Sequence, residues 1–438
     1  MRPALVLPVL LLLAACERQG QNAAADAGEA AGTAAAVDVI ELDVAEAGRR
    51  MTEGKLDSRQ LTQAYLDRIT AIDDAGPAIN AVIELAPDAL AQAEARDAER
   101  AAGQVRGPLH GIPVLLKDNI DATGMVNSAG SLALADHRPA NDAFLVARLR
   151  EAGAVILGKT NLSEWANFRS THSTSGWSGR GGQTRNPYAL DRNPCGSSSG
   201  SAVAVSANLA AVSVGTETDG SILCPAAING VVGLKPTVGL VSRQGILPIS
   251  HSQDTAGPIA RTVADAALLL GVLAGRDPAD AATTNAAWNT TLDYGARLTP
   301  GALKGARIGV LRSKAAIHPD AAAALEGAIQ VMREAGAIVV DAEIPTDGQW
   351  NADELELMLY EFKHGVERYL TERQAPLTTL TQLIGYNERY RVSEMPFFGQ
   401  EHLIAAQAAG GLQARDYVKA LANNQRYSRD KGIDQVLR

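Results

Sequence analysis

Residues 195–237 of this 438-residue chain read CGSSSGSAVAVSANLAAVSVGTETDGSILCPAAINGVVGLKPT. After a loop rich in glycine and serine, an apolar run at residues 211–214 leads into a polar, glycine-containing turn at residues 215–222. Such a turn can point several consecutive backbone N–H groups into one cavity, as an oxyanion hole requires. A lone serine in a turn more often satisfies a loop amide, so a catalytic role for Ser221 needs partners elsewhere in the chain.

Two residues outside this turn are candidates for those partners. Lys117 follows the apolar residues 112–116, which predict a buried strand, so a cation stands at the carboxyl end of that strand. Taken alone, such a lysine is more often a surface residue with a buried aliphatic stem. Ser197 lies in the glycine- and serine-rich loop. None of the seven histidines lies in a recognisable triad motif, so the base for Ser221 must be of another type.

Two short motifs match known signatures, but the secondary structure predicted around them differs from that of the known motifs. Residues 153–160, GAVILGKT, fit the P-loop pattern, yet their middle residues are themselves a predicted strand that follows a predicted helix, the reverse of P-loop order. Residues 196–200, GSSSG, fit the nucleophile-elbow pattern, but the polar, proline-containing residues 191–195 precede them in place of a buried strand. Neither nucleotide binding nor a nucleophile elbow is expected.

The alternation of helical and extended patterns predicts the fold class. A helix is expected to begin at Ser58, with the Ser58 hydroxyl at the cap position. Further strands are expected at residues 155–157, 307–311 and 338–340, and further helices at residues 142–152 and 319–335. This alternation predicts a mixed or mainly parallel sheet covered by helices. The glycine-rich residues 176–200 are too long for a tight turn and predict a functional loop system.

Composition and charge exclude several classes of protein. Apolar residues make up 46% of the chain and aromatic residues only 4%, with 41 glycines, which is typical of a globular enzyme and not of a coiled coil, a collagen or a disordered chain. The formal net charge of -9 argues against nucleic acid as a partner.

The N-terminus predicts a lipoprotein. The apolar residues 3–15 have the length of a secretory signal and are too short to span a bilayer as a helix. Residues 13–16, LAAC, resemble the bacterial lipobox, where the chain is cut before the cysteine and the thiol carries a diacylglycerol; the alternative is an ordinary signal peptide with an accidental cysteine. We expect a signal peptide at residues 1–15, and a lipidated Cys16 with a flexible tether at residues 16–38, on the periplasmic or cell-surface face of a bacterial membrane.

With these residues the chain resembles the amidase signature family. The resemblance runs from about Ser58 to Asp265 and is most specific over residues 195–237. It implies an α/β fold in which a central mixed β-sheet is covered by helices on both faces, in one amidase domain over residues 39–438. Family members continue beyond the point where this chain stops, at Arg438, so the sheet is expected to be incomplete at its C-terminus, with an exposed edge.

The resemblance implies a Ser-Ser-Lys triad that uses no metal and no other cofactor. Ser221 matches the nucleophile, Ser197 the bridging serine, and Lys117 the lysine of the G-I-P-x-x-x-K-D motif. The peptide bond between Gly196 and Ser197 would be cis, as it is in the family. The oxyanion would be held by the backbone amides of Thr218, Asp219, Gly220 and Ser221.

The chemistry of amide hydrolysis is consistent with these roles. A lysine accepts a proton only when it is neutral, so burial must lower the pKa of Lys117 from about 10.4 towards 7 or 8, a shift worth roughly 4 kcal/mol. The proton would then pass from Ser221 through Ser197 to Lys117 and back to the leaving nitrogen. Water would finally hydrolyse the acyl-enzyme on Ser221.

Departures from the family pattern indicate the reaction. Cys195, Ser199 and Asp219 stand where glycine is commoner, and with residues 192–197 they resemble the peptide amidase branch, which hydrolyses the C-terminal amide of peptides. The expected substrates are therefore small peptide amides or other amides. The alternatives are a broad aliphatic or aryl amidase, a lipid-amide hydrolase, or a non-catalytic amidase-like subunit of a tRNA-dependent amidotransferase. The lipobox and the intact triad oppose the last of these.

Other residues carry weaker signals. Ser173 lies in a polar stretch that in the family is near the substrate cleft, and it is a candidate substrate-binding residue, whereas His172 fits a loop hydrogen-bonding role better. Trp165 and Trp177 fit either a pocket wall or buried packing. The two cysteines beside the site, Cys195 and Cys224, are expected by default to be free buried thiols, with a disulfide as the alternative outside the cytoplasm.

Overall fold

A computed structural model describes residues 37–285, 293–315 and 318–438. The expected signal peptide, Cys16 and nearly all of the expected tether lie outside the described residues. Within those residues, no helix has both the length and the apolar character needed to cross a membrane.

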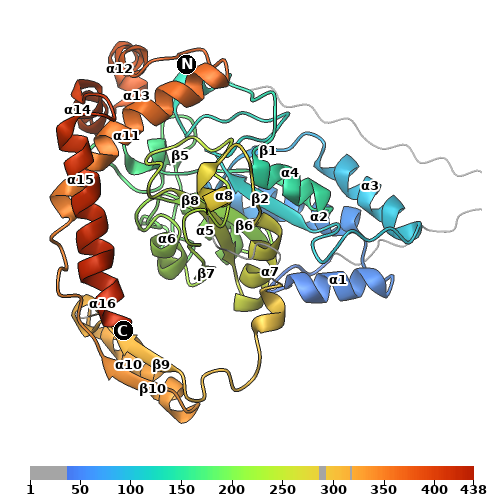
Figure 1. The fold of residues 1–438 in the computed structure, drawn as a ribbon. Helices are drawn as coiled ribbons and strands as arrows, with labels where there is room; N and C mark the ends of the chain where they lie inside the picture. Colours follow the sequence, from blue (N-terminus) through green and yellow to red (C-terminus); the bar gives the residue numbers. More distant parts are fainter. Residues whose placement is uncertain (1–36, 286–292, 316–317) are drawn as a thin grey trace, which may run out of the picture. The chain divides into compact units, whose positions relative to one another are not determined.

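A six-stranded mixed sheet forms the centre of the fold, in the order β1-β3-β2-β6-β8-β7 (Figure 1). The central strand β2 pairs in parallel with β3 and β6, β8 pairs antiparallel with β6, and the outer strands β1 and β7 pair antiparallel with β3 and β8. The predicted mixed sheet is therefore confirmed. The strand bounds are β1 (Val82–Leu85), β2 (Pro113–Lys117), β3 (Val155–Thr160), β6 (Val212–Glu217), β7 (Val232–Gly233) and β8 (Thr255–Ala260).

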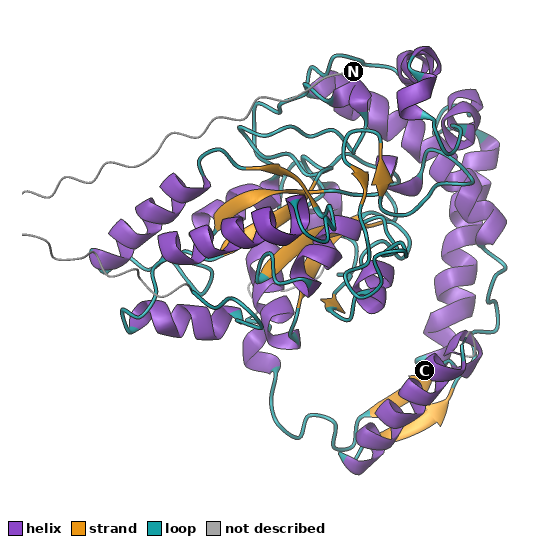
Figure 2. Cartoon of the chain, turned by 180° about the vertical axis from the view of Figure 1, so that it is seen from behind, coloured by secondary structure: helices purple, strands orange, loops and turns teal. Residues whose placement is uncertain are grey.

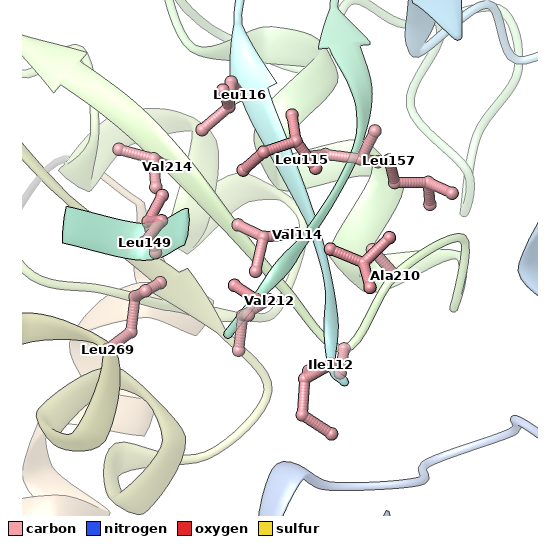
Figure 3. Packing of buried hydrophobic residues seen from close by; sticks show 14 of the residues in the cluster. Ile112, Val114, Leu115, Leu116, Leu149, Leu157, Ala210, Val212, Val214 and Leu269 are labelled. Atoms are coloured by element: carbon pink, nitrogen blue, oxygen red, sulfur yellow. The ribbon is translucent and has the colours of Figure 1, made fainter. Parts of the chain in front are cut away.

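One face of β2 packs into the main hydrophobic core. Side chains alternate between the two faces of a strand, so Val114 and Leu116 share a face. Both are fully buried in a cluster with Leu149 of helix α4 (Phe144–Glu151), shown in Figure 3. Helix α4 packs against β3 and against α7 (Val263–Leu273), which also contacts β6 and β8.

The other face of β2 carries the lysine. Leu115 and Lys117 share this face, and Ser213 is the neighbour of Leu115 on β6. The Ser213 hydroxyl donates a 2.8 Å hydrogen bond to the carbonyl oxygen of Ser201, in helix α5 (Ser199–Ser206). Small side chains let this helix pack closely on β2, β3, β6 and β8, so Lys117 is buried beneath it.

Figure 2 shows helices on both sides of the central strands. The remaining elements up to residue 297 are α1 (Val44–Thr52), α2 (Ser58–Arg68), the π-helical η1 (Ile69–Asp74), α3 (Ala89–Ala101), α6 (Leu223–Ile228), α8 (Ala281–Asn285), three short 3₁₀ segments, η2 (Leu132–Leu134), η3 (Glu164–Asn167) and η4 (Gly295–Arg297), and a small hairpin of β4 (Trp177–Ser178) and β5 (Gly182–Gln183).

The C-terminal part of the chain is mainly helical. A second hydrophobic cluster joins its long helix α11 (Asn351–Glu372) to Trp165 and Phe168, around η3. Strands β9 and β10 pair in parallel with each other and are separate from the central sheet. The bounds here are β9 (Arg307–Val310), α9 (Arg312–Ala315), α10 (Pro319–Glu334), β10 (Ile338–Asp341), α12 (Leu380–Arg389), α13 (Arg391–Glu394), α14 (Glu401–Ala408), α15 (Arg415–Gln425), the π-helical η5 (Arg426–Ile433) and α16 (Asp434–Val436).

The predicted elements agree with the structure to within three residues at their ends, and one cap was assigned wrongly. Helix α2 does begin at Ser58, but its N-cap is Asp57, whose carboxylate accepts from the backbone N–H of Gln60 while the Gln60 side chain accepts from the Asp57 N–H. The Ser58 hydroxyl instead donates a 2.7 Å hydrogen bond to the carbonyl oxygen of Gly111. A carboxylate one residue earlier completes a reciprocal capping box that Ser58 could not make.

The P-loop resemblance is indeed accidental. Residues 155–160 are all strand, so no phosphate-binding loop exists there. The Lys159 ammonium is fully buried and donates to the carbonyl oxygen of Ile120 at 2.7 Å, and it lies 3.4 Å from a carboxylate oxygen of Asp118. This lysine therefore supports the segment that follows β2.

Candidate active site

Lys117 and Ser197 meet beneath helix α5. The Lys117 side-chain nitrogen, Nζ, lies 2.8 Å from the Ser197 hydroxyl oxygen and 2.9 Å from the Thr216 hydroxyl oxygen, and it donates to the Thr216 carbonyl oxygen at 3.1 Å. Both Lys117 and Ser197 are fully buried. The fold therefore brings together two groups that are 80 residues apart in the chain.

The electrostatic environment makes Lys117 easier to deprotonate than an exposed lysine. Burial lowers the pKa of Lys117 to about 7, against the opposing effect of the carboxylates of Glu217 and Asp254. This value agrees with the range expected from the sequence. Near neutral pH much of the amine is therefore unprotonated and can accept a proton.

The loop that carries Ser197 is fixed on both sides. Its Gly196–Ser197 peptide bond is cis, as the family resemblance implied. The carbonyl oxygen of Ser197 accepts from the backbone N–H of Ser163 at 3.1 Å, and the backbone N–H of Ser198 donates to the carbonyl oxygen of Ser221 at 3.1 Å. The two loops that carry the serines are thus hydrogen-bonded to each other.

Ser221 stands at the end of the turn between β6 and α6. The Glu217 carboxylate accepts hydrogen bonds from the backbone N–H groups of Ile222 and Leu223, at 2.7 and 3.0 Å, and so ties the end of β6 to the start of α6. Gly220 adopts a φ of 72°, a left-handed conformation that glycine takes without strain. These contacts fix the backbone on both sides of the nucleophile candidate.

The backbone N–H groups of this turn are the expected oxyanion donors. Within the described part of the chain, the N–H groups of residues 218–221 donate no hydrogen bond. Consecutive free N–H groups beside a serine are what a developing oxyanion requires. The role in an oxyanion hole that the family resemblance implied for the backbone amides of Thr218, Asp219, Gly220 and Ser221 stays a prediction.

Asp254 is a site residue that the sequence reasoning missed. Its carboxylate accepts from the Thr218 hydroxyl at 2.6 Å and from two backbone N–H groups at residues 249–250, at 2.8 and 2.9 Å. Burial raises the pKa of Asp254 to about 6, although these three donors favour the charged form. The register of the two strands reveals its position: Glu217 pairs with Thr255, and this pairing places Asp254 opposite Thr218. The sequence alone does not give this register.

The two cysteines beside the site form a disulfide, so the default expectation of free thiols was wrong. Cys195 and Cys224 are bonded, with Cα atoms 6.0 Å apart. The hydrogen bond from Ser198 to Ser221 holds the loops of the two cysteines side by side. The sequence alone could not give the short distance between their Cα atoms that a disulfide requires. The disulfide joins the loop before Ser197 to the helix after Ser221.

A cavity joins the candidate groups. Within the described residues, no hydrogen bond joins the hydroxyls of Ser197 and Ser221, but both residues line this cavity, and catalytic hydrogen bonds often tighten only when substrate binds. No group of three or more His, Cys, Asp and Glu side chains in the described ranges could hold a metal ion. The polar lining includes Asn119, Ser197, Thr216, Thr218, Ser221 and Asp254, and the apolar lining Ala166, Ile246, Leu247, Pro248 and Ile249.

Ser173 does not line this cavity. Its hydroxyl donates to the carbonyl oxygens of Asn167 and Ser170, at 3.2 and 3.1 Å, so in this structure it satisfies its own loop. A role for Ser173 in substrate binding stays a prediction. His172 is exposed, which suits a loop residue.

The two tryptophans are packing residues. Trp165 is 1% exposed and packs edge-on against Phe362 of α11, with ring centroids 6.4 Å apart. Trp177 is also buried and packs edge-on against Phe397 and Phe398. Trp165 links η3 to α11, and Trp177 links β4 to the loop between α13 and α14.

Comparisons with known protein sequences agree with this site. A family model described as Amidase matches residues 60–434. The chain is 45% identical over 397 residues to a probable amidase of Arabidopsis thaliana, covering 88% of this chain and 75% of that protein. It is 46% identical over 310 residues to a glutamyl-tRNA(Gln) amidotransferase subunit of Roseiflexus castenholzii, covering 70% of this chain and 61% of that subunit.

Solved structures are also similar. The native peptide amidase of Stenotrophomonas maltophilia superposes with a TM-score of 0.89 at 59% sequence identity, covering 91% of this chain and 81% of that chain. An amidase family protein of Bacillus anthracis gives a TM-score of 0.86 at 37% identity, covering 91% and 78%. With the matched family model and the mixed α/β fold, these similarities show that the chain belongs to the amidase signature family and is an amide hydrolase.

Proposed function

We propose that this protein releases ammonia from the C-terminal amide of peptides through an acyl-enzyme on Ser221. The observation that carries the proposal is the buried Lys117 amine, 2.8 Å from Ser197, beside a cavity that Ser221 shares. The substrate class is supported by the 59% identity to the peptide amidase of Stenotrophomonas maltophilia and by the structure of a peptide amidase with the competitive inhibitor chymostatin, also 59% identical to this chain.

The acylation step uses the buried amine as the base. The Ser221 oxygen attacks the amide carbon while its proton passes to Ser197, whose own proton passes to neutral Lys117. The carbonyl oxygen becomes an oxyanion, and the free backbone N–H groups of residues 218–221 stabilise it.

The same relay works in reverse to expel ammonia. As the C–N bond breaks, the proton held by Lys117 returns through Ser197 to the nitrogen, and ammonia leaves. Water then attacks the ester on Ser221 with the same base, which releases the peptide carboxylic acid and restores the free serine. Lys117 must therefore gain and lose a proton twice in each turnover, which suits a pKa near 7.

Replacing the proposed nucleophile tests the mechanism. We expect Ser221→Ala to lower the rate of ammonia release from a peptide amide by at least about a thousandfold, because the variant lacks the hydroxyl on which the proposed acyl-enzyme forms. Ser206→Ala is the matched control: this serine of α5 does not line the cavity, and its hydroxyl donates to the carbonyl oxygen of Asn229. Substantial ammonia release by folded Ser221→Ala would rule out the mechanism.

The pH dependence of kcat/KM tests the base. Only neutral Lys117 accepts a proton, so kcat/KM should rise with pH through about 7 and then level off. The negative charge of Asp254 raises the pKa of Lys117. In Asp254→Asn the midpoint should therefore move to lower pH, whatever happens to the maximal rate. A profile that falls between pH 6 and 8, or a midpoint that moves upward in the variant, contradicts the assignment of Lys117 as base.

A substrate comparison separates the proposed reaction from its alternatives. For a dipeptide amide we expect kcat/KM to exceed that for a simple aliphatic or aryl amide of equal size by about tenfold or more, because the peptide portion offers additional groups to bind. Equal values for the two classes would point to a broad amidase. The remaining alternative is a non-catalytic amidotransferase-like subunit, which the 46% identity to an amidotransferase subunit of Roseiflexus castenholzii keeps in the comparison. The absence of ammonia release from either class of substrate would support that alternative.

We also propose that Cys16 anchors the mature protein to a bacterial membrane through lipid. The support is the LAAC sequence at residues 13–16 and the Cys195–Cys224 disulfide, since disulfides persist mainly outside the cytoplasm. When the whole gene is expressed, the protein should be found in the membrane fraction and be released by detergent, whereas Cys16→Ala should lack the lipid by mass spectrometry of the N-terminal peptide. An unmodified Cys16 in the mature protein would refute the anchor.

A further inference from the structure

One buried oxygen in the catalytic cavity has no hydrogen-bond partner within the described residues. Asn119 lies two residues beyond β2, is 3% exposed and lines the cavity together with Ser197 and Ser221. Its side-chain nitrogen, Nδ2, donates to the Thr216 hydroxyl at 3.0 Å, but its side-chain oxygen, Oδ1, is buried and unpaired. Buried acceptors in native proteins nearly always have a partner, so an unpaired one in an active site points to a ligand.

The position of this oxygen is held by the catalytic residues themselves. The Thr216 hydroxyl that accepts from Asn119 also lies 2.9 Å from Lys117 Nζ. The backbone carbonyl oxygen of Asn119 accepts from the N–H of Leu247, another residue of the cavity wall, at 2.8 Å. Hydrogen bonds therefore hold both the side chain and the backbone of Asn119 in place. Within the described residues, Oδ1 of this side chain has no hydrogen-bond partner.

We propose that Asn119 Oδ1 accepts a hydrogen bond from an N–H of the scissile carboxamide and thereby makes the site selective for amides over esters. This inference rests on the proposed function. With the carbonyl oxygen at residues 218–221, the leaving nitrogen must face Ser197, which returns the proton to it. Asn119 is linked to Ser197 through Thr216 and Lys117, and both Asn119 and Ser197 line the cavity. In the proposed complex the Asn119 oxygen therefore faces the leaving nitrogen.

The chemistry of a primary amide suits this acceptor. Its nitrogen carries two N–H groups and leaves as ammonia, so one N–H can bond to Oδ1 throughout acylation while the nitrogen lone pair turns towards Ser197. An ester has no N–H to donate and leaves Oδ1 unpaired. A site that hydrogen-bonds a substrate N–H discriminates strongly against an analogue that lacks it, because the buried group of the site then has no partner.

The test compares a peptide amide with the methyl ester of the same peptide. Both substrates form the same acyl-enzyme, so kcat/KM for each reports the steps from free enzyme and substrate through acylation and excludes the shared deacylation step. In Asn119→Leu, which keeps the size of the side chain but removes the acceptor, the ratio of kcat/KM for amide to that for ester should fall about 10- to 100-fold from the wild-type ratio. In Asn119→Asp, which keeps an acceptor, the ratio should stay within about threefold of wild type even if the added charge slows both substrates.

A matched control lies outside the cavity. Asn387 of α12 is also fully buried, also donates through Nδ2, here to Gln400 at 3.1 Å, and also has an Oδ1 without a partner among the described residues. Asn387→Leu should leave the amide-to-ester ratio unchanged. Asn119→Ala, which removes the acceptor without filling its space, should repeat the change seen in Asn119→Leu, and thermal unfolding of each variant confirms that folded proteins are compared.

Two results would overturn the inference. An equal loss on amide and ester in both acceptor-free variants would mean that Asn119 acts only through Thr216 and Lys117. A loss of amide selectivity in Asn119→Asp as large as in Asn119→Leu would mean that the amide nitrogen, not the oxygen, faces the substrate. In either case the wild type would still cleave both substrates through Ser221, whereas failure of the proposed function would appear as no ammonia release by the wild type.

Discussion

A primary amine kept away from water is the constraint on which the rest of the site depends. Lys117 ends the central strand of the sheet, and its side chain is fully buried near β3, β6, helix α5 and the loop that carries Ser197. Exposed lysines remain charged at neutral pH, and only desolvation on this scale brings the pKa of Lys117 to about 7. The small side chains of α5, mostly the serines and alanines of residues 199–206, allow the close packing that excludes water. The low pKa of Lys117 therefore depends on the packing of the core around it.

Two carboxylates hold the turn at residues 215–222 and raise the pKa of Lys117. Glu217 binds the backbone N–H groups of Ile222 and Leu223, and Asp254 binds the hydroxyl of Thr218, so the turn is held from both ends. Both negative charges raise the pKa of Lys117, whereas burial lowers it. The balance leaves the amine near half protonation at neutral pH, the condition in which a group can both accept and return a proton.

The loops around the serines depend on contacts with distant parts of the chain. The Cys195–Cys224 disulfide and the hydrogen bond from Ser198 to Ser221 join the two serine loops. The loop at residues 249–254 is held in turn by Glu361 of α11, which accepts from the hydroxyls of Ser250 and Ser252 at 2.6 and 2.9 Å. The C-terminal helices thus help to set the wall of the cavity, although they carry none of the groups proposed to react.

The sequence alone determined the buried strand that ends near Lys117, the turn before Ser221 and the rejection of the P-loop motif, because these follow from local patterns of apolar and polar residues. The family resemblance added the triad and the cis bond before Ser197, and the structure contains that cis bond and the contact between Lys117 and Ser197. Only the tertiary structure decided the disulfide, the role of Asp254 opposite Thr218 and the unpaired oxygen of Asn119. These features depend on strand register and on the packing of segments tens of residues apart, which no local pattern encodes.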